Sequence, residues 1–244
     1  MGIVRLKRHV RLTYYTHAPA GVAQGAVLLF LHGIGEAFVN LRPGEEAAPR
    51  AEIGHDRVLQ QGPPKHLPRL AADHPLRADL LLVVPQLPDR ETSWTDMAEE
   101  VGEITSRHGA DEHGLYIVGF SKGGLGGFQL AKTLGARALV SIDGSPLAED
   151  PREAADHTKR KVRGIPFWAI HTTYGVGESF RKIADFNELL SDHKHEGVGN
   201  RPEVGIQART HHPAPAGMTP VERHVWVCDE VSVLETPYQW LLRH

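Results

Sequence analysis

Residues 115–125 read Leu-Tyr-Ile-Val-Gly-Phe-Ser-Lys-Gly-Gly-Leu, and they carry the most specific local pattern of the chain. Its first part, Leu115–Phe120, is apolar apart from one glycine, as in a strand that is buried on both faces of a sheet. A helical pattern follows over residues 123–134. Between the two lies the pattern G-x-S-x-G, centred on Ser121. The stretch therefore predicts a sharp strand-to-helix turn that exposes the Ser121 hydroxyl at the carboxyl end of a strand, where it can act as a nucleophile.

The same arrangement, a short apolar run followed by a helical pattern, recurs along the chain and is typical of a parallel sheet with crossover helices. An exposed early strand is expected over 10–14, and buried strands are expected at Ala26–Leu31, 79–85, Ala138–Ile142, 165–171 and 204–210. Further helices are expected at 94–108, 179–193 and 236–244. These patterns predict one α/β domain over residues 1–244, with an open, mostly parallel sheet flanked by helices. The less regular segment 36–78 is expected to form a lid or pocket wall.

The composition excludes several classes of function. The chain has 244 residues, and its 27 Lys and Arg against 30 Asp and Glu give a formal net charge of −3, so the basic excess of a nucleic-acid-binding protein is absent. The longest apolar runs fall far short of the roughly 20 residues that cross a bilayer, and the N-terminal segment lacks the apolar core of a signal peptide. The single cysteine, Cys228, excludes an internal disulfide. We therefore expect a cytoplasmic protein with no metal or organic cofactor and no nucleic-acid or membrane partner.

A second motif follows the first buried strand. Residues 31–36 read Leu-His-Gly-Ile-Gly-Glu. A glycine-containing loop at this place can supply a backbone N–H to the oxyanion hole, while the residue after the nucleophile supplies the other. Ile34 and Lys122 are the expected donors.

The general base must lie late in the chain, because this architecture orders its triad as serine, acid, histidine. The candidates are His224 and the pair His211-His212. We favour His224, because it follows a Pro- and Gly-rich stretch that predicts a loop able to place the imidazole over Ser121.

Several motifs in fixed order resemble those of a known group of enzymes. They are LHGIGE (31–36), QGPPK (61–65), VPQLP (84–88) with Trp94, GFSKGG (119–124), IPFWAIH (165–171), HVW (224–226) and YQWLL (238–242). Together they resemble α/β-hydrolase esterases of the predicted-peptidase, phospholipase/carboxylesterase and polyhydroxybutyrate-depolymerase type, over residues 26–244. The resemblance implies an α/β-hydrolase fold in which Ser121 is the nucleophile, His224 is the base, and the backbone amides of Ile34 and Lys122 form the oxyanion hole.

The chain departs from that group at the triad acid. The group places an Asp in a His-Gly-x-x-Asp motif, whereas residues 171–175 read His-Thr-Thr-Tyr-Gly. Glycine has no side chain to orient an imidazole. Three alternatives stay open: Glu178 in the same loop, Asp143 after the preceding strand, or a Ser–His pair without an acid.

The expected substrate is a small carboxylic ester, lactone or thioester that is cleaved through an acyl-enzyme. Three aromatic side chains, those of Tyr174, Trp226 and Trp94, are candidates to line the acyl pocket. Because the acid position is atypical, two alternative functions stay open. One is an α/β-hydrolase site repurposed for lyase, cyclase or acyl-transfer chemistry, and the other is a non-catalytic ligand-binding protein.

Overall fold

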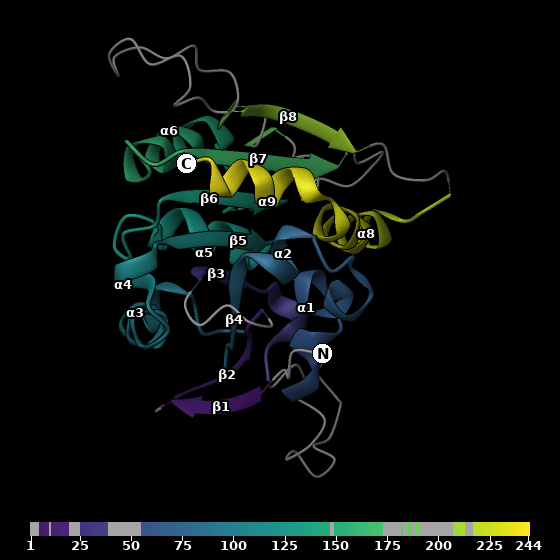
Figure 1. The fold of residues 1–244 in the computed structure, drawn as a ribbon. Coiled ribbons are helices and arrows are strands. Elements are labelled where there is room, and N and C mark those ends of the chain that lie inside the picture. The colour runs from purple at the N-terminus through teal and green to yellow at the C-terminus, as the bar shows by residue number, and fades with distance from the viewer. Residues whose placement is uncertain are drawn as a thin grey trace, which may run out of the picture.

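The computed structural model describes residues 5–9, 11–19, 25–38, 55–146, 149–172, 182, 185–186, 189–190, 207–212 and 217–244. One sheet of eight strands runs through it in the order β1-β2-β4-β3-β5-β6-β7-β8 (Figure 1). Strands β1 and β2 are antiparallel to their neighbours, and β3 to β8 are parallel. The strands are β1 Arg5–His9, β2 Leu12–His17, β3 Ala26–Leu31, β4 Leu80–Gln86, β5 Leu115–Phe120, β6 Ala138–Ile142, β7 Phe167–Thr172 and β8 Gln207–His212.

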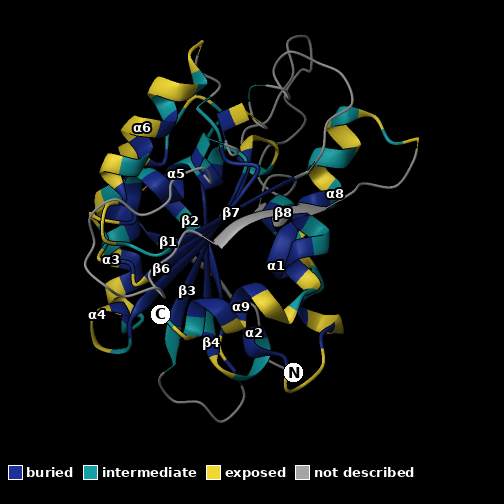
Figure 2. Cartoon of the chain, turned by 90° about the horizontal axis from the view of Figure 1, so that it is seen from above, coloured by how far each residue is buried: buried dark blue, intermediate teal, exposed yellow. Residues whose placement is uncertain are grey.

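Helices cover both faces of this sheet, which Figure 2 shows as a buried layer between them. One face packs under α3 (Ala98–Arg107), α4 (Ala110–His113), α5 (Lys122–Leu130) and α6 (Pro151–Lys161). The other face packs under α1 (Gly62–His66), α2 (Pro75–Ala78), α8 (Pro220–Val233) and α9 (Glu235–Leu242). Short 3-10 helices are η1 (Ile34–Glu36), η2 (His55–Leu59), η3 (Leu67–Arg69) and η4 (Thr95–Met97). The two apolar layers on either side of a parallel sheet explain why its central strands are uniformly apolar.

The parallel register places three strand ends side by side at one edge of the sheet. Leu31 of β3 lies opposite Gly119 of β5, and Phe120 of β5 lies opposite Ile142 of β6. The residues that directly follow these strands therefore meet at the carboxyl edge, the usual place for a binding site in such sheets.

The predicted mostly parallel α/β sheet is confirmed, and two details of the prediction were wrong. The early strand was expected to be exposed, but β2 lies between β1 and β4 and most of its side chains are buried. The stretch before the closing helix was expected to be a loop, but it contains α8.

The structure describes residues 36–38 and 55–78 of the expected lid. The second of these stretches packs through α1 against α8 and through α2 against α9. In the parts of the chain that the structure describes, none of the helices has both the length and the apolar character needed to cross a bilayer.

Candidate active site

The turn that carries Ser121 is built by close backbone packing. Ser121 has φ 54° and ψ −118°, a strained conformation for a residue with a side chain. A side-chain carbon at Gly119 would lie 2.2 Å from the carbonyl oxygen of Gly123, and one at Gly123 would lie 1.9 Å from that of Leu31. Both glycines are therefore required for the start of α5 to approach the ends of β5 and β3. The turn leaves Ser121 partly exposed at the helix N-terminus.

Asp143 stands beside this turn, directly after β6. The Ser121 N–H donates to the carbonyl oxygen of Ile142 at 2.8 Å, and the Asp143 N–H donates to that of Ile170 at 2.8 Å. Asp143 has φ 49°, and it and Ser121 are the non-glycine residues with positive φ among the described residues. Such strain is characteristic of functional positions. The side chain of Asp143 is fully buried.

His224 comes from the opposite end of the chain and meets Asp143. Its Nδ1 lies 3.0 Å from Oδ2 of Asp143. A carboxylate accepts hydrogen bonds and cannot donate them, so the proton of a neutral imidazole lies on Nδ1 and its Nε2 keeps a lone pair. The ring also packs against Phe120, the residue before Ser121, with ring centroids 4.7 Å apart. The contacts thus hold the imidazole beside the serine turn, with Nδ1 directed at the carboxylate.

The structure corrects the expected setting of His224. The residue lies near the start of α8 and not in a loop, because Thr219 and Glu222 form a capping box and Pro220 occupies the first helical position. These three residues form a sequence signal for the start of a helix. The prediction of a loop relied on the prolines and the glycine before Thr219 and overlooked this signal.

The loop after β3 is fixed by a buried histidine. His32 Nδ1 lies 2.6 Å from the carbonyl oxygen of Gly33, and its Nε2 accepts the Leu87 N–H at 3.0 Å. Burial lowers the pKa of His32 to about 4, so its imidazole is neutral at physiological pH. Trp94 packs edge-on to this ring, and its indole N–H donates to the carbonyl oxygen of His32 at 3.4 Å.

The two residues predicted to donate to the oxyanion hole follow neighbouring strands. Ile34 begins η1 directly after Gly33, and Lys122 begins α5 directly after Ser121. The Lys122 ammonium does not point into solvent near the serine but donates to the carbonyl oxygen of Arg90. Burial lowers the pKa of Lys122. The side chain therefore ties α5 to the loop after β4.

A buried carboxyl, which the sequence interpretation quoted in a motif but gave no role, lies at the same loop. Glu36 Oε2 has no hydrogen-bond partner among the described residues and lies 4.0 Å from Nδ1 of His32. Burial raises the pKa of the Glu36 carboxyl, and the nearby His224 opposes this rise in part.

The predicted pocket-lining residues fall into three groups. Trp94 is only 1% exposed and packs within the apolar core. Trp226 lies on α8 and not in a loop, and it packs partly buried against the core on that face. Tyr174 and the predicted acid Glu178 lie outside the described residues.

Within the described ranges, no three His, Cys, Asp or Glu side chains are gathered in a group that could hold a metal ion.

Comparisons with known proteins support the architecture. A thermostable esterase aligns with a TM-score of 0.57 at 16% identity, covering 99% of this chain, and the chain spans only 62% of that protein. The feruloyl esterase module from Clostridium thermocellum, solved in complex with sinapinate, aligns with a TM-score of 0.56 at 13% identity. The alignment covers 97% of this chain and 86% of that module. A dienelactone hydrolase from Anabaena variabilis aligns with a TM-score of 0.54 at 16% identity, and the alignment covers 100% of this chain and 98% of that enzyme.

No protein-family model and no curated protein matches the chain. The structural likenesses, together with the strand order and the turn at Ser121, define the class: the chain has the α/β-hydrolase fold.

Proposed function

We propose that the protein is a serine hydrolase of small carboxylic esters, lactones or thioesters, with Ser121, His224 and Asp143 as its catalytic triad. The observation that carries the proposal is the 3.0 Å contact between His224 Nδ1 and Asp143 Oδ2, beside the strained turn of Ser121. The contact supplies an acid at a different strand end from that of the resembling esterases. It favours Asp143 over Glu178, and it favours a triad over a Ser–His pair.

The reaction follows from this geometry in two halves. In the first, His224 Nε2 takes the proton from Ser121 Oγ while Oγ attacks the acyl carbon, and the oxyanion forms near the backbone N–H groups of Ile34 and Lys122. The C–O or C–S bond to the leaving group then breaks, and His224 returns the proton to that group. Asp143 stays ionised and stabilises the imidazolium while it exists.

In the second half, His224 takes a proton from water, and the hydroxide attacks the acyl-enzyme. The bond to Ser121 Oγ breaks, the serine regains its proton from His224, and the carboxylic acid leaves.

The comparisons support this class of substrate but not a particular one. The structural neighbours include esterases and dienelactone hydrolases. A lactone is a cyclic ester, so these names share one type of bond. We therefore propose a carboxylic-ester bond and leave the acyl and alcohol groups to be identified.

The proposal is tested by labelling with a fluorophosphonate probe, by peptide mass spectrometry, and by hydrolysis of short-chain p-nitrophenyl esters. We expect the wild type to be modified at Ser121 and to hydrolyse the esters. Ser121→Ala should lose both reactions, and His224→Ala should lose rapid labelling. A wild-type protein that is folded but neither labelled at Ser121 nor active on these esters would refute a hydrolase function. The protein should then be tested for ligand binding without turnover.

A further inference from the structure

The half of α8 that carries His224 is less deeply buried than the half that follows it. The fully buried residues of α8 begin only at Val227, after His224, and Val221 and Val225 on the first half are exposed. Apolar burial therefore anchors the later turns of the helix more firmly than the turn that bears the base. Another set of contacts must fix that turn if the imidazole is to stay against Asp143.

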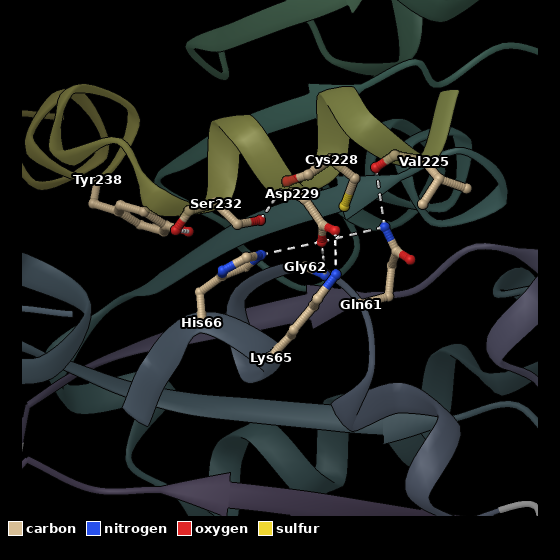
Figure 3. A network of polar contacts seen from close by, with 9 residues as sticks. All are labelled: Gln61, Gly62, Lys65, His66, Val225, Cys228, Asp229, Ser232 and Tyr238. Atoms are coloured by element: carbon tan, nitrogen blue, oxygen red, sulfur yellow. Dashed lines mark hydrogen bonds and ion pairs between the residues drawn. The ribbon is translucent and has the colours of Figure 1, made fainter. Parts of the chain in front are cut away.

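Such a set exists around Asp229, where one short segment brings three hydrogen-bond donors and a histidine ring to a single carboxylate (Figure 3). The backbone N–H of Gly62 lies 3.3 Å from Asp229 Oδ1, and Gln61 Nε2 lies 3.4 Å from the same oxygen. His66 Nε2 lies 3.2 Å from Oδ1, and the Lys65 ammonium pairs with Oδ2. We call Gln61, Gly62, Lys65, His66 and Asp229 the helix clamp.

The helix clamp also reaches the backbone next to His224. Gln61 Nε2 donates to the carbonyl oxygen of Val225 at 3.1 Å, one turn before Asp229 on the same side of α8. One glutamine side chain thus contacts the helix at both positions. Because a misplacement of about 1 Å can cost about 100-fold in rate, contacts at this place are able to control the reaction without touching substrate.

The segment that contains Gly62 packs on β3, the strand before the loop that carries Ile34. Gly62 has φ +64°, and a side-chain carbon there would lie 2.5 Å from the ring of Phe30. The segment therefore packs directly on β3, and β3 continues through His32 to Ile34. The helix clamp connects the strand before the expected oxyanion donor to the helix that carries the base.

We propose that Asp229 is a positioning residue for catalysis, and that the helix clamp holds the first turns of α8 so that His224 keeps its hydrogen bond to Asp143. This inference rests on the proposed function, because it gives Asp229 the task of holding His224 of that triad in place. Asp229 acts through His224 and is not a catalytic residue.

The test compares Asp229→Ala and Asp229→Asn with a matched control, Glu103→Gln. Glu103 is likewise a helix carboxylate contacted by a histidine and a basic side chain, His9 at 2.8 Å and Arg107 at 3.8 Å, but it connects α3 to β1 at the far edge of the sheet. The rate of fluorophosphonate labelling at Ser121 is measured for each variant that circular dichroism shows to be folded. In parallel, the downfield proton resonance of the imidazole N–H bonded to a carboxylate is recorded by NMR, and its loss in Asp143→Asn assigns it.

We expect Asp229→Ala to label about 10- to 100-fold more slowly and to lose the downfield resonance. The labelling rate of Asp229→Asn should fall less, because this variant keeps an acceptor for the Gly62 N–H. Glu103→Gln should keep both the labelling rate and the resonance of the wild type. Unchanged labelling in both Asp229 variants would overturn the inference. So would slower labelling with an intact resonance, or equal losses in Glu103→Gln. A wild type that is not labelled at Ser121 would instead refute the proposed function.

Discussion

The buried His32 gives a prediction whose size follows directly from the structure. Its Nε2 accepts the Leu87 N–H, so a second proton on this ring would break that bond and place a charge in the core. Burial lowers the pKa of His32 from 6.5 to about 4 in the folded protein. The unfolded chain therefore binds a proton on His32 below about pH 6.5, while the folded chain does not bind it until about pH 4.

The sign of the effect follows from these two values. The stability that neutral His32 contributes is fully present above pH 6.5 and is lost progressively as the pH falls to about 4. Below that pH His32 causes no further loss. Each pH unit in this window costs about 1.4 kcal/mol, so His32 alone removes about 3 kcal/mol from the free energy of unfolding between pH 6.5 and pH 4.

The assay is urea unfolding of the wild type and of His32→Gln at several pH values from about 7 to 4. Glutamine keeps one donor and one acceptor but does not titrate in this range. We expect the stability of the wild type to fall more steeply than that of His32→Gln, by about 3 kcal/mol over the window. The exposed His157→Gln serves as the control and should follow the wild type. Parallel curves for the wild type and His32→Gln would refute the reasoning.

Three further predictions concern groups around the site. Gly123→Ala should destabilise the protein by about 3 kcal/mol or more in urea unfolding, because its new side-chain carbon would lie 1.9 Å from the Leu31 backbone. Gly35→Ala, which has open space around it, should change stability by less than about 0.5 kcal/mol. Similar values for the two variants would contradict the packing argument. Burial raises the pKa of the Cys228 thiol well above its usual value, so a disulfide reagent should modify it only after unfolding, and rapid reaction of the native protein would show that the thiol is accessible. Because burial raises the pKa of Glu36, the folded protein keeps this proton to higher pH than the unfolded chain, so the contribution of Glu36 to stability declines as the pH rises above 4.5 and opposes that of His32. The stability of the wild type should therefore rise less steeply with pH above 4.5 than that of Glu36→Gln, and equal pH dependence of the two would count against a protonatable Glu36.

Much of the fold could be predicted because its central strands are continuous apolar runs. The expected bounds of Ala26–Leu31, Leu115–Phe120 and Ala138–Ile142 match β3, β5 and β6, since strands covered on both faces leave an unambiguous signal. Edge structure was harder. The burial of β2 depends on its pairing with β1, whose sequence Arg-Leu-Lys-Arg-His carries no apolar run.

The candidate site was predictable where its residues lie in local motifs, and less so where they meet through the fold. Ser121 and the loop at Ile34 each follow a buried strand, so sequence alone indicates their place. The choice between Asp143 and Glu178 depends on which strand end lies under His224, a tertiary relation that spacing cannot supply. Asp229 was missed for the same reason, because its partners at 61–66 are more than 160 residues away in the chain.

The central claim is that Asp143 orients His224, and the labelling rates of Asp143→Asn and Glu178→Gln test it most directly. Loss of the acid from a serine triad lowers turnover by about 10⁴-fold. We predict a loss of this order in the rate of Ser121 labelling for Asp143→Asn and a rate close to that of the wild type for Glu178→Gln. The reverse result, a large loss in Glu178→Gln with Asp143→Asn unchanged, would contradict the assignment of the triad.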